Sequence, residues 1–121
     1  MKILAIFLTL SVNAMAMDRW SALAMIESGD RDNAVGQAGE VSLYQIRPAL
    51  WAGGSPLNAE TARANAQAIM ARRMAKFEKA HGRAPTDFEF YILWNAPNQI
   101  GHPHRVVSER ASRFVSLVQE K

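Results

Sequence analysis

Residues 25–48 read MIESGDRDNAVGQAGEVSLYQIRP, and this stretch decides how the rest of the chain is interpreted. It begins with a carboxylate, Glu27, which is followed at once by Ser28 and Gly29. A polar, glycine-containing segment comes next, and the stretch closes on residues 43–46, Leu-Tyr-Gln-Ile. Because glycine directly after a periodic segment is typical of a helix end, we predict that Glu27 lies at the end of a helix, just before a loop.

This first helix is predicted over about residues 18–28, with Asp18 as its N-cap. Trp20, Leu23 and Glu27 recur at helical spacing and therefore share one face. A carboxylate on an apolar face loses part of its hydration, and this desolvation raises its pKa. Glu27 is therefore a candidate acid/base, although a glutamate at a frayed helix end commonly points into solvent instead.

Three further helical segments are predicted at residues 59–80, 86–95 and 103–119. Asn58 is a good N-cap for the first of them, and Gly82 ends it. Thr86 and Glu89 have the spacing of a capping box, and the short apolar helix that they begin ends at Asn95. The sequence thus predicts one mainly α domain. Residues 40–46 fit either a short strand or the start of a short helix, so we expect at most a minimal β element.

The N-terminus has the three parts of an export signal. Lys2 is followed by an apolar run at residues 3–10 and by an A-x-A site at residues 14–16. We expect residues 1–16 to be a signal peptide and residues 17–121 to form the mature domain, periplasmic or secreted; an uncleaved anchor is the alternative. The apolar run is shorter than the roughly 20 residues that span a membrane, so no stable membrane insertion is expected after cleavage.

Composition argues against several classes of site and partner. The 121 residues include no cysteine, which excludes disulfides and thiolate metal sites. His102 and His104 lie two apart without a third candidate ligand nearby, so neither a metal nor another cofactor is expected. The formal charge of +3 is spread along the chain. This balance suits mild attraction to an anionic polymer such as a cell wall, and it is too weak to indicate nucleic acid.

Several short motifs, taken in order, resemble the lysozyme-like lytic transglycosylase domain. They are Ile26–Gly29, Ala34–Gly36, Gly39, Leu43–Ile46 with Pro48, and Leu93–Ala96. That family opens with a Glu-Ser pair at a helix end, continues through a glycine-rich loop and a G-L-x-Q-[IL]-x-P-like segment, and later has A-Y-N at the end of a buried helix. The resemblance covers nearly the whole mature chain and implies a small lysozyme-like helical domain with a catalytic cleft.

The chain departs from the family pattern at three positions. Ser42 stands where the family usually has glycine, which suggests a slightly different loop path. Trp94 stands where tyrosine is usual, so any role that needs that tyrosine hydroxyl is in doubt. Glu40 adds a second carboxylate to the loop, and this residue leaves the stereochemical mechanism open.

The resemblance implies cleavage of the β-1,4 bond between N-acetylmuramic acid and N-acetylglucosamine in peptidoglycan. Glu27 would act as general acid and then as base on the muramic 6-hydroxyl, whose closure onto C1 gives a 1,6-anhydro product without a second enzymic carboxylate. The residues implied around the cleft are Ser28, Tyr44, Gln45, Trp94 and Asn95. Tyr44 and Trp94 could stack on sugar faces, and plain core packing is the alternative, more so for Trp94 than for Tyr44.

Two other functions remain open at this stage. A hydrolytic muramidase would pair Glu27 with Glu40 or Asp32 as its second carboxylate, although a solvated loop position is the simpler interpretation of Glu40. A non-catalytic wall-binding or adaptor module would keep the fold without the chemistry. In each case the expected ligand is the glycan strand of peptidoglycan, and the small size of the domain suggests guidance by a secretion-apparatus or wall-synthesis partner.

Overall fold

The computed structural model describes residues 16–119, which form four α-helices and two single-turn 3-10 helices. In chain order these are α1 (Arg19–Ser28), η1 (Pro48–Leu50), α2 (Ala59–His81), α3 (Asp87–Asn95), η2 (Pro97–Gln99) and α4 (Arg105–Gln119). The predicted mainly α fold is confirmed. The predicted signal peptide, apart from Ala16, lies outside the described residues. Among the described helices, none combines the length and apolar character needed to cross a membrane.

The helix ends are set by the local signals in the sequence. Asp18 and Asn58 each accept a hydrogen bond from the backbone N–H three residues on, at 2.8 and 3.0 Å. Thr86 and Glu89 form the predicted capping box at the start of α3. Gly29 ends α1 in the left-handed conformation, with φ of 65°, which a residue without Cβ adopts at little cost. These caps fix the residues at which the helices begin and end.

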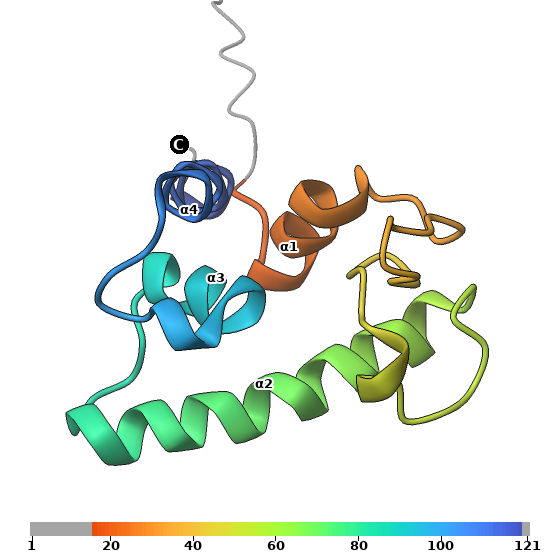
Figure 1. Cartoon of the computed structure of the whole chain (residues 1–121). Helices are drawn as coiled ribbons and strands as arrows, with labels where there is room; N and C mark the ends of the chain where they lie inside the picture. The colour runs from red at the N-terminus through yellow and green to blue at the C-terminus, as the bar shows by residue number, and fades with distance from the viewer. Residues whose placement is uncertain (1–15, 120–121) are drawn as a thin grey trace, which may run out of the picture.

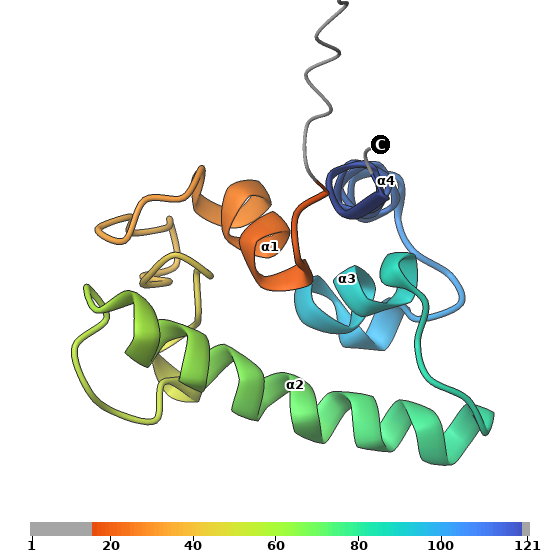
Figure 2. The same cartoon turned by 180° about the vertical axis from the view of Figure 1, so that it is seen from behind.

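The short apolar helix α3 is the centre of the domain. Five consecutive residues, Phe90–Trp94, are buried, and Figures 1 and 2 show α3 between the long helix α2 and the end-on helix α4. The Phe90 ring stacks on Phe114 of α4 at 5.6 Å and meets Trp20 of α1 edge-on at 5.7 Å between ring centroids. Since α3 is packed on several sides, its C-terminal end is held in a defined position relative to α1.

The segment between α1 and α2 contains the small β element. Within residues 16–119 the β structure consists of two isolated bridges, Val35 with Val41 and Val41 with Ile46. Residues 42–45 form a turn between the second pair, so the 40–46 segment is neither a continuous strand nor the start of a helix. Ser42 is buried in this turn with φ of 78°, a left-handed conformation that favours glycine.

Candidate functional site

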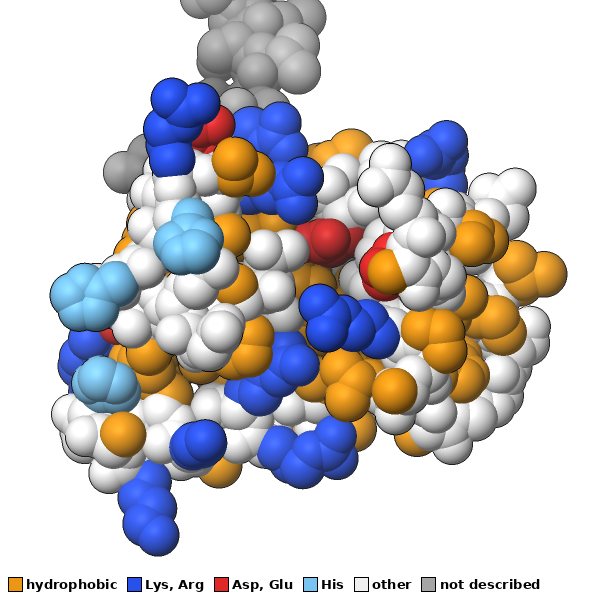
Figure 3. All heavy atoms as spheres, viewed as in Figure 1, with side chains coloured by type: hydrophobic (Ala, Val, Ile, Leu, Met, Phe, Trp, Pro, Cys, Tyr) orange, Lys and Arg blue, Asp and Glu red, His pale blue; other side chains and the backbone are white. Residues whose placement is uncertain are grey.

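A cleft of about 920 Å³ lies between the helices α1, α2, α3 and α4 and the loop that joins α1 to η1, whose residues 37–47 are here called the loop wall. Its lining includes Glu27 from α1, Glu40 and Gln45 from the loop, and Trp94 and Asn95 from the end of α3. Figure 3 shows acidic side chains in the hollow of this face with basic side chains around them. The volume is at the upper end of the range for small-ligand sites, about 300–1,000 Å³, so the cleft has room for an extended polar ligand.

Glu27 lies in the last turn of α1 and reaches the cleft while remaining partly buried, as its face of the helix predicts. Tyr91 of α3 donates a hydrogen bond from its hydroxyl to Glu27 Oε1 at 2.9 Å. Burial raises the pKa of Glu27, and the charge of Glu40 adds to this rise, whereas the Tyr91 hydrogen bond and the charge of Arg110 oppose it. The carboxyl is therefore biased toward the protonated form that a general acid needs.

Tyr91 is a site residue that the sequence motifs do not indicate. Its side chain is buried, and burial, together with the neighbouring Glu27 carboxylate, raises the pKa of its hydroxyl well above the usual range. The hydroxyl therefore stays protonated and acts as a fixed donor to Glu27. A tyrosine inside an otherwise apolar helix was the available signal, because a buried phenol needs a hydrogen-bond partner.

Glu40 shares the cleft with Glu27, and Asp32 does not. The Glu40 carboxylate packs directly over the backbone of Gly36, where a Cβ atom would collide with its Oε2. The same Cβ would come within 2.8 Å of Gln45 Oε1, so Gly36 leaves room for both polar side chains. Asp32 is exposed in the loop and lies outside the cleft lining. The position of Asp32 therefore gives no support to its role as a second carboxylate, which stays a prediction.

Two of the predicted cleft residues lie elsewhere. Ser28 is buried, and its hydroxyl donates to the Ala24 carbonyl at 3.0 Å and accepts from the Arg31 backbone N–H at 3.2 Å, which ties the end of α1 to the loop. Tyr44 is 4% exposed and packs edge-on between Trp20 and Trp94. It borders a separate small pocket and not the Glu27 cleft, because the turn at residues 42–45 points it into the core.

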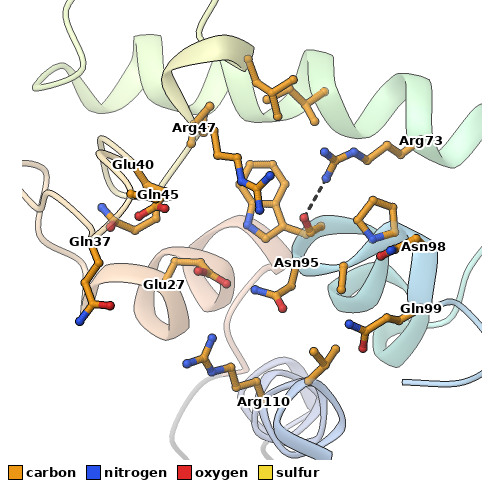
Figure 4. Close-up of a pocket in the computed structure, with 18 residues that line it drawn as sticks. Glu27, Gln37, Glu40, Gln45, Arg47, Arg73, Asn95, Asn98, Gln99 and Arg110 are labelled. Atoms are coloured by element: carbon orange, nitrogen blue, oxygen red, sulfur yellow. Dashed lines mark hydrogen bonds between the residues drawn. The ribbon is translucent and has the colours of Figure 1, made fainter. Parts of the chain in front are cut away.

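Gln45, Trp94 and Asn95 do line the cleft. The Gln45 amide nitrogen donates to the Ala34 carbonyl at 3.1 Å and to the Ser42 carbonyl at 2.9 Å, so this side chain also holds the loop closed. Trp94 is 9% exposed and serves mainly as the cleft wall. Core packing was expected more for Trp94 than for Tyr44. The structure shows the reverse, since Tyr44 is the one confined to the core. Asn95 points into the cleft near Glu27 (Figure 4).

Three arginines complete the lining: Arg47, Arg73 and Arg110. Arg73 of α2 donates from Nη1 to the carbonyls of Leu93 and Trp94, at 2.9 and 2.8 Å. These bonds satisfy carbonyls at the C-terminal end of α3 and fix the backbone that carries Asn95. Arg110 is exposed, and its helix α4 places it at the edge of the cleft (Figure 4).

Among residues 16–119, no group of three or more His, Cys, Asp or Glu side chains is arranged to hold a metal ion. Comparison of the chain with protein-family models, curated proteins and solved structures gave no match.

Proposed function

We propose that this protein cleaves the β-1,4 bond between N-acetylmuramic acid and N-acetylglucosamine in peptidoglycan, as a lytic transglycosylase. The observation that carries the proposal is the Glu27 carboxyl, which is partly desolvated, held by the Tyr91 hydroxyl and open to a cleft of about 920 Å³. A carboxyl group in this environment keeps its proton to higher pH than an exposed glutamate does, and protonation of a glycosidic oxygen requires such a proton. The sequence motifs around Glu27 support the same reaction class.

In the proposed reaction, Glu27 gives its proton to the glycosidic oxygen as the bond from that oxygen to C1 breaks. The 6-hydroxyl of the same muramic residue then forms the new bond to C1, and the Glu27 carboxylate takes the hydroxyl proton. Each proton is accounted for, and Glu27 returns to its starting state. Tyr91 contributes by holding Glu27 Oε1 through the 2.9 Å hydrogen bond, which restricts the carboxyl to one orientation.

Gln45 and Asn95 are proposed to bind the sugar, because their amide groups border the cleft on either side of Glu27 (Figure 4). Trp94 offers the exposed part of its side chain as an apolar wall. Ser28 and Tyr44 are assigned structural roles on the strength of their burial and contacts. Export of the protein to the compartment that holds peptidoglycan is part of the same proposal.

A hydrolytic muramidase is the second candidate, because Glu40 lines the same cleft and its charge raises the pKa of Glu27. In that reaction Glu40 would activate water or serve as the nucleophile. A non-catalytic wall-binding module is the third candidate. It does not explain why the pKa of the Glu27 carboxyl is raised in the cleft.

Digestion of purified peptidoglycan followed by mass spectrometry of the released muropeptides separates these functions. The transglycosylase reaction yields anhydro-muramic ends, which are lighter by one water molecule than the reducing ends made by hydrolysis. Release of reducing ends alone would replace the proposal with the muramidase. Binding to peptidoglycan without any release would contradict both enzymes and support the binding module.

A further inference from the structure

Two arginines of the cleft have no role in the reaction described above. Arg47 precedes η1 on the loop wall, and Arg110 lies on α4; Figure 4 shows them entering the cleft from opposite walls, with Glu27 and Asn95 between them. Both residues are exposed. Their guanidinium groups are therefore available to a ligand that lies along the cleft.

Within residues 16–119, neither arginine forms an ion pair with a carboxylate. The ion pairs in the described part of the chain are Arg19–Asp87, Arg83–Glu89 and Arg105–Glu109, and all three lie outside the cleft lining. Arg73, the third cleft arginine, is already bound to backbone carbonyls of α3. The cleft thus contains three arginines and two carboxyl groups, and one of those carboxyls, Glu27, must be protonated to act as an acid.

An uncharged glycan would form no ion pairs with these arginines, so the excess of positive charge would not contribute to its binding. The charge of Arg110 favours the ionised form of Glu27 and so opposes its function as an acid. An anion on the ligand would pair with Arg110 and weaken that effect. Guanidinium groups bind carboxylates through two parallel hydrogen bonds, so carboxylates are the ligand groups that suit this pair of residues.

We propose that Arg47 and Arg110 form a carboxylate-recognition pair that selects glycan strands carrying intact anionic stem peptides. This inference rests on the proposed function, because the muramic residues of peptidoglycan are the units that bear such peptides. Arg110 binds a carboxylate close to the scissile bond, and Arg47 binds one from the opposite wall. Strands stripped of their peptides, or with neutralised carboxylates, are poor ligands.

The test is calorimetric binding to the purified Glu27→Gln protein, which holds the ligand without cleaving it. Three soluble tetrasaccharide fragments of peptidoglycan serve as probes: one with intact stem peptides, one with the peptide carboxylates amidated, and one without peptides. The intact fragment should bind about tenfold more tightly than the other two, and added salt should reduce this preference. Adding Arg47→Gln or Arg110→Gln should remove most of the preference, whereas the control Arg113→Gln, exposed on α4 outside the cleft, should keep it.

Equal binding of the intact and amidated fragments would overturn this inference and leave the proposed function standing. A loss of preference in Arg113→Gln as large as in Arg110→Gln would also overturn it, because the effect would then reflect general surface charge. Failure of all three fragments to bind would count against the proposed function itself. Arg110→Lys keeps the charge but not the paired donors, so it should retain only part of the preference for the intact fragment that Arg110→Gln removes.

Discussion

The Tyr91 hydroxyl donates a 2.9 Å hydrogen bond to Glu27 Oε1, and this contact joins residues 64 positions apart in the sequence. It couples the central helix α3 to the last turn of α1. Because Tyr91 is a donor to the carboxyl, it favours the ionised form of Glu27, while burial favours the protonated form. The balance between these two effects sets the pH range in which Glu27 can act as an acid.

Replacing Tyr91 with phenylalanine removes the donor and leaves the ring. The pKa of Glu27 should then rise further, because the hydrogen bond that lowers it is lost. Since the acid must be protonated, the fall of kcat/KM on the alkaline side should move to higher pH in Tyr91→Phe. Tyr44→Phe is the matched control, as Tyr44 lies outside the cleft, and its profile should be unchanged. An unshifted profile in Tyr91→Phe would show that this contact does not tune Glu27.

Glu40→Gln distinguishes the two enzymatic mechanisms. The transglycosylase reaction needs no second carboxylate, so activity should stay within about tenfold of the wild type, in contrast to the ~10²–10⁴-fold loss typical of an acid–base residue. Loss of the Glu40 charge should lower the pKa of Glu27 and move the alkaline limb to lower pH, opposite to Tyr91→Phe. Asp32→Asn, exposed and outside the cleft, is the control. A loss in the larger range would point to Glu40 as a second catalytic carboxylate.

The partly buried carboxylate of Glu27 should lower the stability of the folded protein relative to a variant with an uncharged side chain at this position. Glu27→Gln is nearly isosteric, can still accept from Tyr91 and carries no charge, so its free energy of unfolding near neutral pH should exceed the wild type's by on the order of 1 kcal/mol. Below the ordinary glutamate pKa of 4.5, Glu27 is protonated in both states and the difference should vanish. Urea unfolding at several pH values measures this, and a variant less stable than the wild type throughout would contradict the burial argument.

Glu89 should show the opposite dependence on pH. Its hydrogen bonds with Arg83 and Thr86 lower its pKa to about 2, so its contribution to stability is complete above pH 4.5 and is lost as the pH falls toward 2. Glu89→Gln should lower the free energy of unfolding by about 1 kcal/mol near neutral pH, because glutamine can still cap the helix but loses the ion pair with Arg83 and the negative charge at the start of α3. The difference between the two proteins should shrink as the pH falls from 4.5 toward 2, and a difference at pH 2 as large as that at neutral pH would rule out this explanation.

The helices could be predicted from the sequence because their signals are local. The caps at Asp18 and Asn58, and the capping box at Thr86, act over three or four residues and need no tertiary context. The burial of Glu27 followed from helical spacing for the same reason. Local patterns were therefore enough to identify the helix that carries the candidate acid.

The details of the cleft could not be predicted in this way. Tyr91 meets Glu27 only because α3 packs against α1, and that contact leaves no trace in local spacing. The left-handed turn at Ser42 and Gln45 decides which side chains of the loop face the core, so Tyr44 turns inward while Gln45 lines the cleft. Local spacing also could not assign Arg110 to the cleft, because the face of α4 that borders the cleft depends on how that helix packs.

The most direct measurement compares the wild type with Glu27→Gln on purified peptidoglycan, with the released muropeptides identified by mass spectrometry. Glu78→Gln, which is exposed on α2 away from the cleft, is the control. We predict anhydro-muramic products from the wild type and from the control, and a loss of about 10²–10⁴-fold or more in Glu27→Gln. Full release of the same products by Glu27→Gln would contradict the assignment of Glu27 as the catalytic acid and base.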